Sequence, residues 1–252
     1  MNGHNLLEGK RVIVTASAGA GIGYATAKRC IEEGATVVLS DIHERRLGET
    51  ADEFAKEFGT RPLAIVCNVT NESDVQGLFD KAIAELGGVD VAVNNAGLGG
   101  TRDLVDMPDE EWNAVLNVSL TGTMRCTRAA LRHMIPRKDG AIINLSSVLG
   151  WRAQAGQAHY AAAKAGIAAL TRVAAMEAAP HNVRVNAVAP SLAMHPFLEK
   201  VMPKETLDEL VQLEAFKRSA EPFEVANVIV FLASEYSSYM TGEVVSVSSQ
   251  HP

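Results

Sequence analysis

Short apolar runs rich in β-branched residues recur along the chain, separated by segments long enough to form helices. The runs occupy residues 12–14, 36–39, 63–66, 89–93, 141–145, 183–188 and 244–247. Most positions in each run are apolar, which is typical of strands that are buried on both faces of a sheet. Such strands alternating with helices predict an α/β fold, a doubly wound parallel sheet covered by helices on each side.

The alternation is interrupted once, between residues 190 and 220. An apolar and charged stretch lies there between the sixth predicted strand and the helix that follows Pro222. Because an insertion at the carboxyl edge of a parallel sheet lies where substrates enter, we expect a substrate lid near residues 190–220. No internal repeat, low-complexity tract or flexible linker divides the sequence, so we expect a single domain over residues 1–252.

Composition narrows the class of protein further. The 252 residues are 47% hydrophobic, enough to bury a full core. A net charge of −7, from 23 basic and 30 acidic residues without a basic run, argues against nucleic acid as a partner. No stretch resembles a signal peptide or a membrane span, so we expect a soluble, cytoplasmic protein without membrane contact. The three cysteines, widely spaced in apolar contexts, are expected to be reduced core thiols, and no metal-ligand cluster is evident, so no metal is expected.

The most informative side chains are Tyr160 and Lys164, four residues apart and therefore on one face of a helix. A free tyrosine has a pKa near ~10, so proton exchange near neutrality requires a downward shift of roughly 3 units, of which an adjacent ammonium can supply part. Ser147 follows the run at 141–145 and should lie at the carboxyl end of a strand, where its hydroxyl can hold a substrate oxygen. Taken alone, such a pair is most often a tyrosine beside a solvated lysine.

Two glycine-containing turns add to this picture. Residues 15–23, Thr-Ala-Ser-Ala-Gly-Ala-Gly-Ile-Gly, join the first predicted strand to a helix, so that the backbone and the helix N-terminus can approach a pyrophosphate. Residues 94–97, Asn-Asn-Ala-Gly, permit a similarly close approach to a cofactor. By itself, the first turn is equally compatible with an ordinary strand-helix connection, and the second with a plain β-turn.

In this order, the glycine-rich turn, the Asn-Asn-Ala-Gly run, Ser147 and the Tyr-x-x-x-Lys pair resemble the short-chain dehydrogenase/reductase family, from about residue 6 to about residue 248. The resemblance implies a Rossmann-like fold and hydride transfer between a nicotinamide and a carbinol carbon. By this resemblance, Tyr160 passes a proton to or from the substrate oxygen and Ser147 positions that oxygen. Lys164 would bind the nicotinamide ribose and lower the pKa of Tyr160. Ser146 is a rival to Ser147, but the thirteen-residue interval to Tyr160 selects Ser147.

The expected cofactor is NAD. Asp41 ends the second predicted strand, where its carboxylate can accept hydrogen bonds from the ribose hydroxyls and would repel the 2′-phosphate of NADP. Arg45 and Arg46 lie just downstream and could reach that phosphate, so NADP stays open. Asn68 is expected to accept a bond from the adenine amino group, Val69 to pack on the ring, and Asn94 to contact the cofactor and brace its strand. The full set of expected cofactor-binding positions is Ser17, Gly19, Gly21, Ile22, Gly23, Asp41, Asn68, Val69, Asn94, Ala96, Gly97, Tyr160, Lys164 and Pro190.

The sequence departs from the family pattern at several positions. Ala16 replaces the first glycine of the turn, and the turn is one residue longer. Ser119 stands where the family has an asparagine in a locally opened helix, from which water relays protons to the lysine; we expect the Ser119 hydroxyl to hold that water, as a fourth catalytic residue. His195 stands where the family has a threonine that contacts the nicotinamide carboxamide. It can act as a donor, face the substrate, or be an exposed loop histidine.

The sequence resembles an actinobacterial subgroup associated with steroid-ring degradation, some members of which act on coenzyme A thioesters. The positions that carry this resemblance are Ser17, Ser119, Ser191, His195 and the segments 150–152 and 98–102. Trp151 offers an apolar plate for a bulky substrate, and an anionic tail could meet one of several basic side chains. Basic side chains of this kind are more often solvated surface charges. The candidates are Arg102, Arg152, Lys200, Lys204 and Lys217.

We therefore predict an NAD-dependent oxidoreductase that interconverts a secondary alcohol and a ketone on a steroid-ring-derived or other acyl-CoA thioester. The alternatives are an NADP-dependent 3-ketoacyl-thioester reductase, a catalytically idle dinucleotide-binding scaffold, and a sugar-nucleotide epimerase or dehydratase. Members of the family commonly assemble through the helices after Pro108 and Pro222 and the last strand, so a homo-oligomer, tetramer or dimer, is expected.

Overall fold

A computed structural model describes residues 3–194 and 204–249 and contains one sheet of seven parallel strands. The strands are β1 (Arg11–Thr15), β2 (Thr36–Asp41), β3 (Leu63–Val66), β4 (Val91–Asn94), β5 (Gly140–Leu145), β6 (Val183–Pro190) and β7 (Val244–Val247). Their order in the sheet is β3-β2-β1-β4-β5-β6-β7, and every neighbouring pair is parallel. The predicted doubly wound α/β fold is confirmed.

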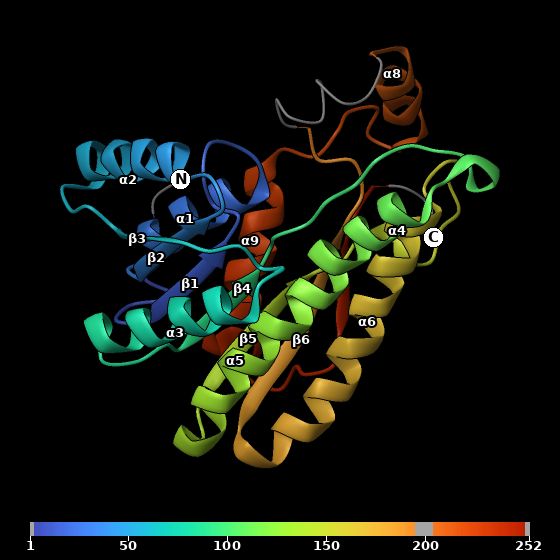
Figure 1. Cartoon of the computed structure of the whole chain (residues 1–252). Helices are drawn as coiled ribbons and strands as arrows, with labels where there is room; N and C mark the ends of the chain where they lie inside the picture. The colour runs from blue at the N-terminus through green and yellow to red at the C-terminus, as the bar shows by residue number, and fades with distance from the viewer. Residues whose placement is uncertain (1–2, 195–203, 250–252) are drawn as a thin grey trace.

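Helices cover both faces of this sheet (Figure 1). On one face lie α1 (Ile22–Glu32), α2 (Glu44–Phe58) and α9 (Pro222–Ala233), and on the other α3 (Glu72–Leu86), α5 (Gly122–Arg137) and α6 (Ala158–Ala178). In β1, Val12 and Val14 enter the first core while Ile13 enters the second. This two-sided burial is the reason that the strands are apolar at consecutive positions.

The helix predicted after Pro108 is split by a wider turn. It consists of α4 (Asp109–Leu116), a π-helical turn labelled η2 (Asn117–Thr121), and then α5. A π-helical turn inserts one extra residue into the helical repeat and is frequent at functional sites. The remaining short helices are η1 (Leu104–Asp106), η3 (Val148–Gly150), η4 (Ala179–His181) and η5 (Glu235–Ser237).

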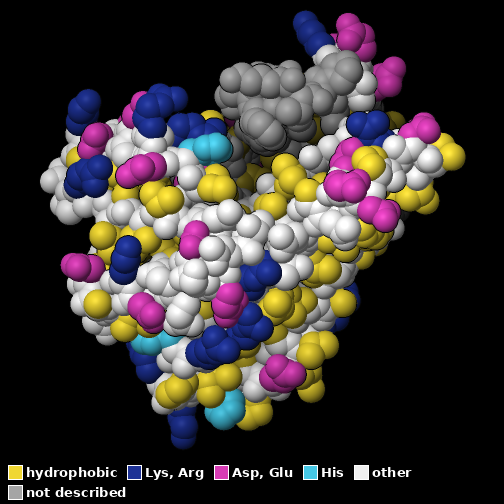
Figure 2. All heavy atoms as spheres, viewed as in Figure 1, with side chains coloured by type: hydrophobic (Ala, Val, Ile, Leu, Met, Phe, Trp, Pro, Cys, Tyr) yellow, Lys and Arg dark blue, Asp and Glu magenta, His cyan; other side chains and the backbone are white. Residues whose placement is uncertain are grey.

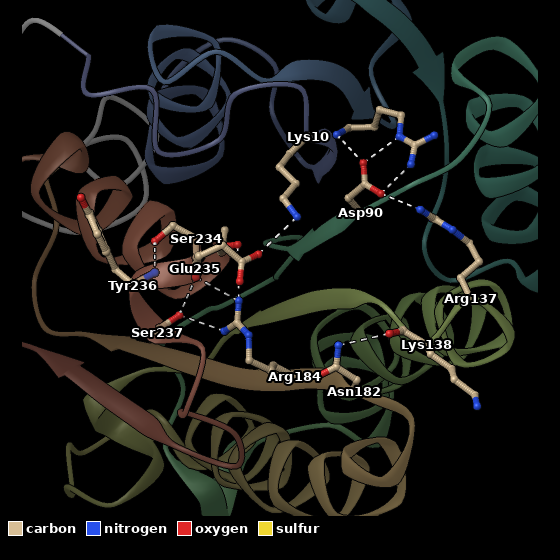
Figure 3. Close-up of polar contacts among 12 residues, drawn as sticks. Lys10, Asp90, Arg137, Lys138, Asn182, Arg184, Ser234, Glu235, Tyr236 and Ser237 are labelled. Carbon is tan, nitrogen blue, oxygen red and sulfur yellow. Dashed lines mark hydrogen bonds and ion pairs between the residues drawn. The ribbon is translucent and has the colours of Figure 1, made fainter.

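Charged side chains connect neighbouring elements at the amino edge of the sheet (Figure 3). Asp90 accepts hydrogen bonds from the guanidinium groups of Arg11 and Arg137. Burial opposes ionisation of Asp90, but these bonds prevail and hold its pKa well below the usual range. Arg184 donates to the backbone carbonyls that end α9, where a cation also complements the helix dipole.

The opposite, carboxyl edge is where the strand order reverses. From β1 the chain continues through β2 and β3 on one side, whereas β4 lies on the other side of β1. The carboxyl ends of β1 and β4 therefore flank a switch point, the place where open α/β sheets bind their ligands.

The insertion near residues 190–220 begins and ends at this edge. Its base is closed by a bridge between Ala193 and Ala220, and α8 (Lys204–Leu213) stands apart from the two helical layers (Figure 1). His195 and Lys200 lie outside the described residues. Among the helices of residues 3–194 and 204–249, none is both long and apolar enough to cross a membrane.

Candidate active site

The glycine-rich turn leaves the N-terminus of α1 open. Gly21 precedes the helix with a φ of 97°, and no side chain caps the helix. The first backbone N–H groups of α1 are therefore left for an anion. A Cβ at Gly23 would overlap the carbonyl oxygen of Ala16, so the close approach of turn and helix requires glycine there. These features fit the pyrophosphate of a dinucleotide.

The longer turn is tied to β2 and α2. The Ser17 hydroxyl accepts the N–H of Ser40 at 3.0 Å and lies 3.3 Å from its carbonyl oxygen, so this predicted cofactor residue directs its side chain to β2. The Gly19 N–H donates to the Thr50 hydroxyl at 2.9 Å. This N–H, at a predicted cofactor-binding position, is therefore already used within the protein. Thr50 lies on α2, far from the turn in sequence, and had no signal in the sequence.

Asp41 occupies the predicted place at the end of β2. Its Oδ1 accepts the N–H of His43 at 2.9 Å, and its Oδ2 lies 3.4 Å from the N–H of Ala18 in the turn. A nitrogen of Arg46 is 3.8 Å from Oδ1, while Arg45 pairs with Glu49 on the surface of α2. A carboxylate stands beside the turn as expected, and one of the two arginines reaches it.

Asn68 and Val69, which were expected to contact the adenine, make contacts within the protein instead. The Asn68 Oδ1 accepts both the N–H and the hydroxyl of Thr70, at 3.0 and 2.8 Å. Its two lone pairs are thus used within a local turn, and the expected acceptance of a further bond has no lone pair in this arrangement. The Val69 side chain packs in the core against Gly122 at the start of α5.

The two asparagines of the Asn-Asn-Ala-Gly run make hydrogen bonds to different parts of the protein. The Asn94 amide donates to Asn144 at 2.8 Å and to Thr127 at 3.1 Å, which braces β4 against β5 and α5. Asn95 takes the role that sequence reasoning missed: its N–H donates to the Thr15 hydroxyl at 2.9 Å and its side chain to the backbone of the glycine-rich turn. The Ala96 N–H also donates to Thr15.

The structure brings Ser147, Tyr160 and Lys164 together where β5 ends and α6 begins. The Ser147 hydroxyl accepts the Leu149 N–H at 3.2 Å and lies 3.5 Å from the carbonyl oxygen of Pro190 at the end of β6. It is also near enough to Tyr160 to influence the pKa of that phenol. The Lys164 ammonium donates to the Leu145 carbonyl at 2.7 Å and lies 5.4 Å from the centre of the Tyr160 ring.

Burial acts on the ionisation of both Tyr160 and Lys164. Burial raises the pKa of Tyr160, and the hydrogen bond from Ser147 lowers the pKa only in part. Burial also lowers the pKa of Lys164 to about 8. The net direction is thus set by burial. The expected lowering of the Tyr160 pKa by Lys164, whose nitrogen lies 5.4 Å from the centre of the tyrosine ring, stays a prediction.

Ser119 lies buried in the π-helical turn. Its hydroxyl accepts the Leu98 N–H and donates to the Leu98 carbonyl, both at 3.0 Å. A Cβ at Gly97 would lie 3.6 Å from the Lys164 nitrogen and 3.7 Å from the Ser119 oxygen, so the three positions meet at one point. The Ser119 hydroxyl already donates its proton to Leu98, so it could bind a water only by accepting a hydrogen bond. The water relay through Ser119 stays a prediction.

The loop over residues 98–102 forms a wall of the site. Gln157 donates to the Gly100 carbonyl and the Thr101 hydroxyl, and a Cβ at Gly99 would lie 3.4 Å from the Tyr160 ring. Trp151, on the segment between Ser147 and Tyr160, is 49% exposed.

The basic side chains that were expected to meet an anionic tail lie in different surroundings. Arg102 is paired with Glu111, so its charge is largely compensated. Lys204 opens α8, and Lys217 donates to a backbone carbonyl at the end of the same helix. Arg152 lies beside Trp151 and is part-buried.

Comparison with known proteins agrees with this geometry. Residues 16–249 match a family model described as enoyl-(acyl carrier protein) reductase. The chain is 59% identical over 251 residues to the (5R,7aS)-5-hydroxy-7a-methyl-1-oxo-2,3,5,6,7,7a-hexahydro-1H-indene-carboxyl-CoA reductase of Mycobacterium tuberculosis, covering 99% of this chain and 96% of that one. It is 41% identical over 246 residues to a 3-oxoacyl-(acyl-carrier-protein) reductase of Thermotoga maritima, covering 96% and 97%. A crystal structure of a short chain dehydrogenase from Mycobacterium smegmatis superposes with a TM-score of 0.89 at 55% identity, covering 100% and 97%.

Proposed function

The chain belongs to the short-chain dehydrogenase/reductase family and is an NAD(P)-dependent oxidoreductase, and from this premise we propose that it interconverts a secondary alcohol and a ketone on a polycyclic acyl-CoA thioester with NAD as cofactor. The observation that carries the proposal is the buried Lys164, whose nitrogen lies 5.4 Å from the centre of the Tyr160 ring, in a chain that is 59% identical to a bicyclic acyl-CoA reductase.

The residues divide the chemistry between them. A bound nicotinamide dinucleotide supplies or accepts the hydride. The Tyr160 hydroxyl gives its proton to the carbonyl oxygen in reduction, and takes it back in oxidation. Ser147 holds the same oxygen, since its own hydroxyl is oriented by the Leu149 N–H. The Lys164 ammonium lies near enough to the tyrosine ring to hold a ribose hydroxyl beside it.

The substrate class is argued from shape and from the relative. The bicycle in that relative's name, an indene with an angular methyl group and a ring ketone, has the carbon skeleton of two fused steroid rings. A rigid apolar substrate suits the exposed Trp151 and the exposed apolar Leu104 and Val105, which follow the loop that forms the wall. The alternative, a 3-ketoacyl-thioester reductase, is supported by the relative at 41% identity.

NAD is favoured over NADP by Asp41. Its carboxylate stands at the end of β2 beside the turn, where it would repel a 2′-phosphate. Arg46 weakens this repulsion from 3.8 Å, so we expect a preference rather than exclusion. A catalytically idle scaffold is disfavoured because Ser147, Tyr160 and Lys164 are all present and adjacent.

The test is a comparison of steady-state rates. Purified protein is assayed with a steroid-derived bicyclic keto acyl-CoA, with a linear 3-ketoacyl-CoA, and with each of NADH and NADPH. We expect the highest kcat/KM for the bicyclic thioester with NADH, and loss of turnover by about a thousandfold in Tyr160→Phe, which lacks the transferred proton. A preference for the linear thioester would remove the substrate class, and full activity of Tyr160→Phe would remove the mechanism.

Assembly as a homo-oligomer stays our prediction. Figure 2 shows hydrophobic side chains gathered along α5 and α6, and a groove of about 480 Å³ lies between these helices. Val173 of α6 lines this groove and is exposed. We expect a second copy to cover this exposed apolar groove, because such patches mark interfaces. Light scattering of the purified protein should give the mass of a dimer or a tetramer.

A further inference from the structure

A buried histidine precedes the proposed proton donor. His159 lies in the first turn of α6 with 0% of its surface exposed. Its Nδ1 accepts the backbone N–H of Tyr160 at 2.9 Å. Its Nε2 has no hydrogen-bond partner among the described residues, and the carboxylate oxygen Oε1 of Glu111 is 3.6 Å away.

These contacts define the tautomer. The first N–H groups of a helix have no partner within the helix, so Nδ1 satisfies one of them. Because Nδ1 accepts a hydrogen bond, it carries no proton, and the neutral ring must hold its proton on Nε2. A doubly protonated ring would carry a proton on Nδ1 and could not accept the Tyr160 N–H. The ring therefore supports the backbone of Tyr160 as a neutral acceptor.

The other side of the ring meets the wall of the site. A Cβ at Gly100 would lie 3.4 Å from the His159 Nε2 and 3.5 Å from the Glu111 Oε1, so Gly100 covers the gap between these two atoms. Glu111 belongs to α4, whose continuation is the turn that carries Ser119, and its second oxygen is held by Arg102. His159 thus contacts α6, the wall loop and α4 at once.

We propose that His159 is a positioning residue that fixes the first turn of α6 and thereby aims the Tyr160 hydroxyl at Ser147 and the substrate oxygen. The inference rests on the proposed role of Tyr160 in proton transfer. It acts through the acceptor at Nδ1, while Nε2 lies 3.6 Å from the Glu111 carboxylate without a hydrogen bond. Small displacements of a reacting group lower the rate strongly, so loss of this support should appear in kcat.

Two variants of equal shape isolate the acceptor. Asparagine and leucine are branched at the same atom, but the Oδ1 of asparagine can take the place of Nδ1 and leucine has no acceptor. We expect His159→Asn to keep kcat within about threefold of the parent and His159→Leu to lower kcat by about tenfold or more. The KM for NAD should be unchanged in both, because the glycine-rich turn and Asp41 are not touched. Melting temperatures show whether both variants are folded.

Equal kcat values for His159→Asn and His159→Leu would overturn the proposal, as would a change in the KM for NAD without a change in kcat. If His159→Leu does not fold, His159→Gln decides. Its oxygen falls near the Nε2 position and leaves the Tyr160 N–H without an acceptor, so it must lower kcat where His159→Asn does not, and equal rates again overturn the proposal. Tyr160→Phe is measured beside them: if it retains activity, the proposed function fails, and that outcome is distinct from failure at His159.

Discussion

Replacing the buried Lys164 with methionine should stabilise the fold while abolishing turnover. Lys164 is 4% exposed, and burial lowers its pKa from 10.5 to about 8. At 1.36 kcal/mol for each unit, holding this ammonium in the folded protein costs about 3 kcal/mol at neutral pH. Methionine has a similar length and no charge, so the variant Lys164→Met escapes that cost.

Part of the gain is offset. The Lys164 nitrogen donates to the Leu145 carbonyl at 2.7 Å, and a buried carbonyl left without a partner costs about 1–3 kcal/mol. The net stabilisation at pH 7 is therefore about 1 kcal/mol, a rise in Tm of about 2–4 °C for a chain of this size. Turnover should fall at least about a hundredfold, because the cationic group beside Tyr160 is gone.

The pH dependence is the sharper measurement. Between pH 8 and 10.5 the unfolded chain keeps the lysine proton and the folded protein loses it, so the stability of the parent rises with pH over this range. The advantage of Lys164→Met should accordingly shrink by about 1 kcal/mol between pH 7 and 9. Urea unfolding at both pH values measures it, with the exposed Lys56→Met on α2 as the control that should show no such change. A difference between Lys164→Met and the parent that is the same at both pH values would refute the reasoning.

Three further changes test other parts of the site. Ser119→Ala removes both bonds to the Leu98 backbone, so kcat/KM should fall by about tenfold, whereas an unchanged rate and pH profile would exclude Ser119 from the reaction. Gly23→Ala places a methyl group on a carbonyl of the preceding turn, so calorimetry should detect no NAD binding; normal binding would contradict the close approach seen there. Asn144→Leu strips buried partners from β4, α5 and α6 and should lower the free energy of unfolding by about 3 kcal/mol in urea, and a loss below about 1 kcal/mol would mean that this network is not needed.

The fold could be predicted because its signal is local. Each strand is apolar on both faces, and each run lies between segments of helical length, so strand positions and the two-sided covering follow without knowledge of long-range contacts. The split of the long helix at Asn117–Thr121 has no local signal of this kind and was expected only from the family resemblance at Ser119. Its sequence is compatible with an ordinary helix, and the wider turn is accompanied by a contact between Ser119 and Leu98, which lies 21 residues away in the chain.

The site could be predicted at the level of residues and less well at the level of roles. Spacing placed Ser147, Tyr160 and Lys164 together because strand ends and helix faces have fixed geometry. The division of work between Asn94 and Asn95 could not be read, since adjacent residues at a strand end point to opposite faces and only the assembled sheet shows which face holds the glycine-rich turn.

The protonation of Tyr160 marks the limit of reasoning from spacing. The four-residue spacing of Tyr160 and Lys164 predicts that the ammonium supplies part of the downward pKa shift of the phenol. Burial at the junction of β5 and α6 instead raises the pKa of Tyr160 and lowers the pKa of Lys164, so both shifts favour the neutral forms. Burial within the protein thus opposes the ionised pair, which the four-residue spacing alone does not reveal.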